Sequence, residues 1–199
     1  MATSNFEEAE NAARDIRRRL GVDALTWLDP MTILVKLRRV IPGFQFELVE
    51  ASDLPGAQAR WNSAKKRILI VRRSFEAANG QRAEPRDRFS IFHEVVHAMR
   101  GDHGVLNRAM SRTEIPNYAK KLRAIESFTD QIAAAVIAPR HLVKNTDSPE
   151  DVAFRFGMSI SAARIRLDEI FGRNSQGRKV PESVAQLLFD LSSDMKHRH

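Results

Sequence analysis

Cysteine is absent from the 199 residues of this chain. No disulfide can therefore hold the fold together, and no thiolate can serve as a metal ligand or nucleophile. Long apolar runs are absent too, since the longest, residues 132–138, is far too short to span a bilayer. The N-terminal segment lacks the apolar core of a signal peptide. We therefore expect a cytoplasmic protein with no membrane association.

Repeats and low-complexity tracts are also lacking, and the composition of 43% hydrophobic and 29% charged residues is that of an ordinary globular protein. The length suits one core, or one core with a smaller appendage. Acidic residues are too few to balance the basic ones, which leaves a formal charge of +7. This excess favours nucleic acid or an acidic protein as partner, although scattered basic runs are often only solvated surface.

The segment RFSIFHEVVHAM, residues 88–99, reads as a helix that is apolar on nearly every side. On such a helix His93 and His97 lie one turn apart and only about 40° apart around the axis, so both imidazoles can reach one metal ion. Glu94 is rotated by about 100° from His93. Its carboxylate therefore lies beside the metal, where it can act as general base toward a metal-bound water. The alternative is a chance match on a surface helix, which the apolar context disfavours.

A catalytic zinc site of this type needs a third protein ligand and one open position for water. The candidate is Glu126, in an amphipathic helix predicted over residues 118–139. Asp130 follows one helical turn later near the same apolar stripe. It is placed to accept the ring N–H of a ligand histidine and so to orient that ligand.

Two alternatives to this ligand set stay open. In the first, Glu126 forms only a surface ion pair with Arg123 or Lys121. In the second, the third ligand is His103, six residues after His97. Histidine and carboxylate ligation suits one zinc ion (Zn2+), although manganese (Mn2+) or iron can occupy such a site.

These two segments carry a resemblance to a known family. RFSIFHEVVHAM, followed by Glu126, Asp130 and the sequence AAAVIAP, is similar to the ImmA/IrrE family of metallopeptidases over residues 30–171. The resemblance implies a zincin-like metal helix, with Glu126 at the family's metal-ligand position and Asp130 at its Asn/Asp position. Thermolysin-like enzymes use the same His-His-Glu ligand set.

The chain departs from the family's usual residues at positions that affect packing and leave the chemistry intact. Val95 and Val96 stand in place of Leu-Gly, and Thr129, Ile132 and Ala138 replace the usual Ala, Phe and Met. The resemblance implies a zinc metalloendopeptidase that cleaves a specific regulatory protein, typically a helix-turn-helix repressor or antitoxin-like partner, and thereby derepresses genes.

Apolar periodicity predicts an α+β fold that is mainly helical. Helices are expected over residues 5–20 and 31–40, the second started by Asp29 and Pro30. Strands over residues 44–50, 56–62 and 67–71 predict a small antiparallel sheet of about three strands, packed on the metal helix. Residues 74–86 and 101–117 are expected to be irregular connections.

An exposed edge strand can hold an extended peptide by main-chain pairing. Residues 57–61 are the candidate, although a packing role alone explains them nearly as well. A peptidase also needs a group that stabilises the tetrahedral oxyanion. His103, Arg112 and Tyr118 are candidates, and the sequence does not choose among them.

The chain changes character after residue 139, which predicts a metallopeptidase domain over residues 1–139 and a helical region over residues 140–199. Ser148 and Ser159 are expected to start two helices that end at residues 156 and 171, with a turn at residue 157 between them. The stretch VAFRFGMSISAARIRL, residues 152–167, matches helix-turn-helix spacing. Ser161 and Arg164 would then face a DNA groove. The alternative is packing or partner recognition without base reading, and a last amphipathic helix is expected over residues 180–195.

Two further functions compete with the peptidase. In one, the chain is a DNA-binding or repressor-binding regulator whose metal site is structural. In the other, it keeps the metal but binds a repressor without cutting it. Glu94 favours the enzyme, because a structural site needs ligands but no general base.

Overall fold

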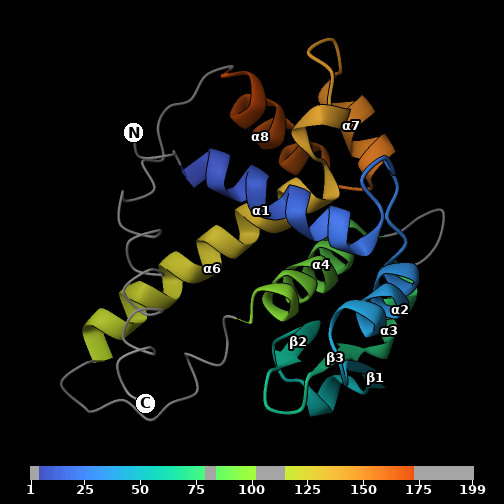
Figure 1. Cartoon of the computed structure of the whole chain (residues 1–199), viewed down its shortest axis with the longest axis vertical. Coiled ribbons are helices and arrows are strands. Elements are labelled where there is room, and N and C mark those ends of the chain that lie inside the picture. Colours follow the sequence, from blue (N-terminus) through green and yellow to red (C-terminus); the bar gives the residue numbers. More distant parts are fainter. Residues whose placement is uncertain (1–4, 79–83, 102–114, 173–199) are drawn as a thin grey trace.

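The computed structural model describes residues 5–78, 84–101 and 115–172, and within these ranges the fold is α+β and mostly helical (Figure 1). The helices are α1 (Asn5–Leu20), α2 (Pro30–Val40), α3 (Arg72–Ala78), α4 (Pro85–Arg100), α6 (Ile115–Ile137), α7 (Pro149–Phe156) and α8 (Ile160–Phe171). The strands are β1 (Gln45–Val49), β2 (Ala59–Asn62) and β3 (Arg67–Val71). Among the described residues, no helix is both long and apolar enough to cross a membrane.

The three-stranded sheet is mixed, and the prediction of an antiparallel sheet was wrong. β3 lies in the middle, parallel to β1 and antiparallel to β2, with Ile68 opposite both Phe46 and Trp61. The chain reverses between β1 and β2 and again between β2 and β3, so β1 and β3 run in the same direction. Because β3 lies between β1 and β2, the parallel strands β1 and β3 are neighbours. Residue alternation indicates strands but does not fix their order in the sheet.

Side chains start the helices where the sequence indicated. Pro30 is the first residue of α2, and Asp29 accepts the main-chain N–H three residues later at 2.7 Å. The hydroxyls of Ser148 and Ser159 do the same for α7 and α8 at 3.1 and 3.2 Å. These bonds satisfy N–H groups that the first turn of a helix leaves unpaired.

Two segments that were predicted to be irregular are partly helical. α3 extends into the connection predicted over residues 74–86, because Ser74 and Ala78 lie one turn apart and are both buried. α6 begins at Ile115, before its predicted start at residue 118. The rest of the second connection, residues 102–114, and the helix predicted over residues 180–195 lie outside the described residues.

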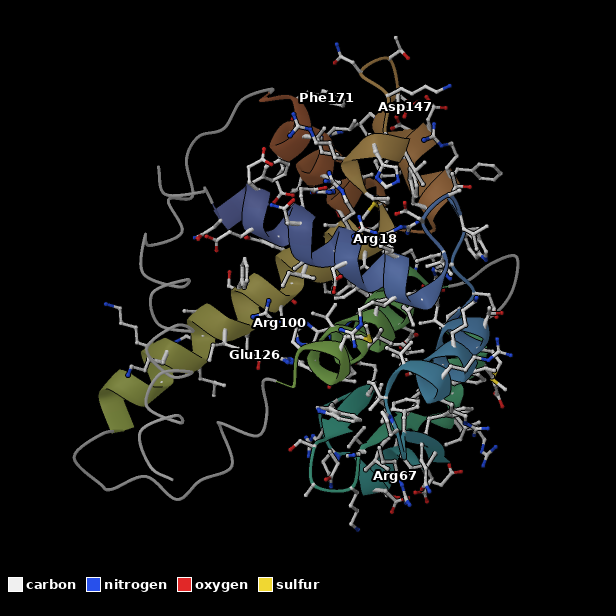
Figure 2. The ribbon with its side chains drawn as sticks, viewed as in Figure 1. Arg18, Arg67, Arg100, Glu126, Asp147 and Phe171 are labelled. Carbon is white, nitrogen blue, oxygen red and sulfur yellow. The ribbon has the colours of Figure 1, made fainter. Side chains whose placement is uncertain are left out.

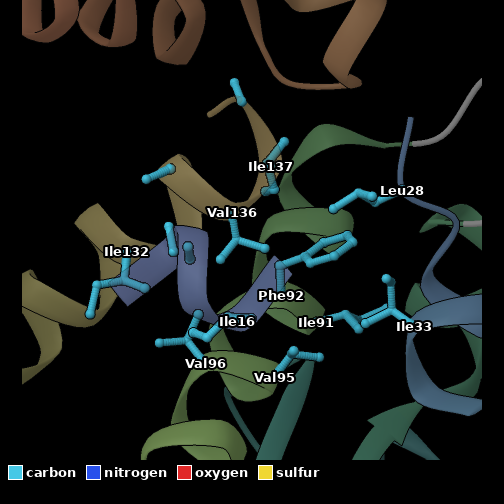
Figure 3. Close-up of a cluster of buried hydrophobic side chains, with 14 of the residues drawn as sticks. Ile16, Leu28, Ile33, Ile91, Phe92, Val95, Val96, Ile132, Val136 and Ile137 are labelled. Carbon is cyan, nitrogen blue, oxygen red and sulfur yellow. The ribbon is translucent and has the colours of Figure 1, made fainter. Parts of the chain in front are cut away.

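Helices α1, α4 and α6 meet in the apolar core that fixes the metal helix (Figure 3). Ile16 of α1, Val96 of α4 and Val136 of α6 are each at most 3% exposed. Burial of one such side chain stabilises the fold by about 1.5–3 kcal/mol. The core therefore holds α4 against α6, which allows polar side chains on their facing sides to meet.

Three arginines are buried among the described residues, which the basic runs of the sequence did not indicate: Arg17, Arg88 and Arg166 are each at most 2% exposed. Arg17 of α1 donates to the carbonyl oxygen of Val136, near the end of α6, at 2.6 Å. Arg166 of α8 forms a buried ion pair with Glu10 of α1. Arg17 is therefore part of the core and does not belong to a basic surface.

The buried residues of α7 and α8 belong to the same apolar cluster as those of α1, α4 and α6. Val152 and Phe156 of α7 and Ala163 of α8 are fully buried in it. Both helices thus pack on the region that carries the metal helix. The division of the chain at residue 139 stays a prediction.

Candidate metal centre

α4 supplies three of the predicted site residues. The helix begins at Pro85 and ends at Arg100, and the capping residue after it, Gly101, has a left-handed φ of 71°. Its buried residues include those on either side of the HExxH pentapeptide, so the helix lies in the core as expected. The side chain of His97 is 1% exposed and that of His93 is 15% exposed. Both imidazoles therefore lie largely out of water.

α6 supplies the two carboxylates. Glu126 lies where α6 passes α4 (Figure 2), and its side chain is 38% exposed. Asp130 follows one turn later on the same helix and is 55% exposed. The core contact between α4 and α6 brings these carboxylates to the histidines, which lie 29 to 37 positions away along the chain.

Three ligand atoms converge on one point. Nε2 of His93 lies 2.9 Å from Nε2 of His97 and 3.0 Å from Oε2 of Glu126, while the His97 to Glu126 separation is 3.4 Å. Ligands about 2.0–2.2 Å from a tetrahedral zinc ion lie about 3.3–3.6 Å from one another. Among the described residues, this is the group of histidines and acids found close enough to hold a metal. The donor set can hold one metal ion, and two of the three separations are shorter than those expected around a bound zinc ion.

Asp130 fixes the orientation of His93. Its Oδ1 lies 2.8 Å from Nδ1 of His93. An ionised carboxylate only accepts hydrogen bonds, so Nδ1 carries the proton. In the neutral ring Nε2 then presents its lone pair toward His97 and Glu126, which is the tautomer that metal ligation requires.

The electrostatics of the group favour a bound cation. Burial lowers the pKa of His93, but hydrogen bonds with Asp130 and Glu126 raise it to about 10. Hydrogen bonds with His93 and His97 hold the pKa of Glu126 well below its usual range. Burial raises the pKa of Glu94. A carboxylate with a raised pKa is a better base toward water, as a peptidase requires.

Glu94 has a partner that the sequence analysis missed. Its Oε2 accepts the main-chain N–H of Trp61 in β2 at 2.6 Å. β2 is an edge strand of the sheet and packs against α4. A main-chain donor leaves no trace in residue identity, so no signal in the sequence indicates this contact.

The other predicted residues have different outcomes. His103 and Arg112 lie outside the described residues, and Tyr118 lies in α6 without a described side chain. The alternative ion pair of Glu126 is not formed with Arg123, whose Nε donates to the carbonyl oxygen of Ala119 in its own helix at 3.3 Å.

Comparison with known proteins adds no family assignment. No protein-family model matches the sequence, and no curated protein matches it. The resemblance to the ImmA/IrrE family thus rests on the two helical segments and on the side chains they bring together. The family stays a prediction, and the grouping of His93, His97 and Glu126 is the finding on which a function must be built.

Proposed function

We propose that this chain is a zinc-dependent endopeptidase. The observation that carries the proposal is the convergence of His93, His97 and Glu126 from two helices, with Glu94 next to His93 on α4. A structural site requires only ligands, whereas a hydrolytic site also requires a base. Glu94 supplies that base.

The residues divide the chemistry among themselves. His93, His97 and Glu126 would hold a zinc ion, which would supply Lewis acidity and lower the pKa of the attacking water toward about 7. Glu94 accepts the proton from the attacking water and delivers it to the leaving amine. Asp130 keeps Nδ1 of His93 protonated and thereby fixes the ligand tautomer.

The substrate class follows from the resemblance to the ImmA/IrrE family. Its members act on regulatory proteins, so we propose a helix-turn-helix repressor or an antitoxin-like protein as substrate. Cleavage of such a partner would derepress the genes that it controls. A gene for a small helix-turn-helix protein beside the gene for this chain would name the first substrate to test.

The decisive experiment pairs zinc content with peptide cleavage. Purified protein is loaded with zinc, and cleavage of a mixed library of quenched fluorogenic peptides is followed. We expect cleavage that a chelator abolishes and added zinc restores. Glu94→Gln should retain one zinc ion by elemental analysis yet lose cleavage. Equal cleavage by Glu94→Gln and the wild type would rule out Glu94 as the base.

A second candidate is a binding function of α7 and α8. Residues 157–159 connect the two helices. The exposed residues of α8 include Arg164 and also Ile165, which is 61% exposed. Phe154 of α7 is 86% exposed. Large apolar groups on a surface favour a protein partner over phosphates.

The alternative, specific DNA binding by this region, is tested by mobility shifts with upstream sequence. Specific binding should give a discrete complex that Arg164→Ala weakens, whereas diffuse, salt-sensitive binding indicates electrostatics alone.

A further inference from the structure

The outer edge of β2 is set by its pairing with β3. The carbonyl oxygen of Gln58, just before β2, accepts a main-chain N–H of Val71 in β3 at 2.8 Å. Paired residues alternate along an antiparallel strand, so Arg60 also turns its N–H and C=O toward β3. The N–H and C=O of Ala59 and Trp61 therefore point away from the sheet.

The outward N–H of Trp61 contacts Glu94, the proposed general base on α4. It donates to Oε2 of Glu94 at 2.6 Å, across 33 positions of sequence. Trp61 is 7% exposed, and its indole stacks on the ring of Phe44, with ring centroids 6.1 Å apart. The strand pairing and this stacking together hold the donor in place. The carboxylate of Glu94, which accepts from this N–H, is therefore held at the edge of the sheet.

We propose that the main-chain N–H of Trp61 is a positioning group that holds Glu94 in its catalytic orientation. The catalytic part of this inference rests on the proposed peptidase function. A glutamate side chain has several rotatable bonds, and fixing Oε2 on a rigid donor removes most of its alternatives. Oε1 of Glu94 makes no hydrogen bond within the described part of the chain and is left to take the proton. The sheet therefore serves catalysis through its main chain.

The contact itself can be tested without any substrate. Amide hydrogen exchange at Trp61 is measured by NMR in the full-length wild type and in Glu94→Ala. An outward edge N–H that loses its charged acceptor should exchange about 10- to 100-fold faster. The amide of Arg60, which pairs with β3, is the matched control and should not change. Equal exchange at Trp61 in both proteins would overturn the inference.

The catalytic role is tested by comparing Trp61→Pro with Trp61→Phe. Proline removes the outward N–H without removing a bond to β3, and edge strands accept proline at such positions. Phenylalanine keeps the N–H and an aromatic ring, so it measures the loss of the indole alone. We expect kcat of the proline variant to lie about 10- to 100-fold below that of the phenylalanine variant, with equal KM and zinc content.

Two results would contradict positioning. Equal kcat in the proline and phenylalanine variants would show that the tether does not matter, and a higher kcat with proline would show that it inhibits. Should Trp61→Pro fail to fold, the exchange comparison in Glu94→Ala still decides whether the contact exists. Absence of cleavage in the wild type would instead count against the peptidase, because the exchange result does not depend on activity.

Discussion

Oδ1 of Asp130 lies 2.8 Å from Nδ1 of His93, one helical turn beyond Glu126 on α6. One helix thus places a carboxylate at the ligand group and a second carboxylate behind one of the histidines. The first carboxylate, Glu126, is a candidate metal ligand. The second, Asp130, decides which ring nitrogen of His93 faces the ligand group.

Replacement of Asp130 should weaken zinc binding without unfolding the protein. Loss of such a partner typically costs about 10- to 100-fold in metal affinity or activity, and we expect this for Asp130→Ala in competition with a chromophoric chelator. Asp130→Asn should lose less, because its amide oxygen still accepts the ring N–H. Circular dichroism checks the fold. Wild-type affinity in Asp130→Ala would show that the contact with His93 has no part in metal binding.

Replacement of Glu126 should remove the metal itself. Glu126→Ala takes away one of three ligand atoms, and we expect zinc content by elemental analysis to fall together with cleavage. Arg123→Ala on the same helix is the matched control, because Arg123 bonds only within α6 among the described residues. Full zinc content in Glu126→Ala would make the ligand assignment wrong, and His103 would be the next residue to replace.

Zinc affinity should rise with pH. Hydrogen bonds with Asp130 and Glu126, which outweigh burial, raise the pKa of His93 to about 10, so the metal-free ring is protonated at neutral pH. A metal ion must displace that proton. Between pH 6 and 8 we expect roughly a tenfold gain in affinity per pH unit for one displaced proton.

Calorimetry in buffers of different ionisation enthalpy counts the protons released on zinc binding. Asp130→Ala should flatten the pH dependence, because it removes one of the two carboxylates that raise the pKa of His93. An affinity that does not change with pH would contradict a protonated His93 in the metal-free protein.

Gly157, which follows α7, should tolerate substitution less well than Gly172, which follows α8. It has a φ of 63°, and an added Cβ would lie 2.5 Å from the ring of Trp27 and 2.8 Å from Nε of Arg88. Gly172 has a similar φ of 68° with nothing within 4 Å of such an atom. Gly157→Ala should therefore lower the free energy of unfolding by about 1–3 kcal/mol more than Gly172→Ala, the cost of overpacking. Equal costs in chemical denaturation would show that Trp27 and Arg88 move aside freely.

Elements with local causes could be predicted from the amino-acid sequence. Helical periodicity placed His93 and His97 on one side of α4, because residues four apart lie one turn apart. Asp29, Ser148 and Ser159 started their helices because their side chains accept N–H groups only three residues away. The α+β class and the strands of the sheet followed from the same short-range patterns.

Features that depend on contacts between distant segments could not be predicted and are seen only in the folded chain. The order of β1, β3 and β2 depends on which strand edges meet, and alternation along one strand carries no record of that choice. Arg17 lies in the core because its guanidinium donates to the carbonyl oxygen of Val136 in α6 and to that of Val22 after α1. The bond from Trp61 to Glu94 uses a main-chain N–H, which every residue except proline possesses, so the sequence of β2 does not distinguish it.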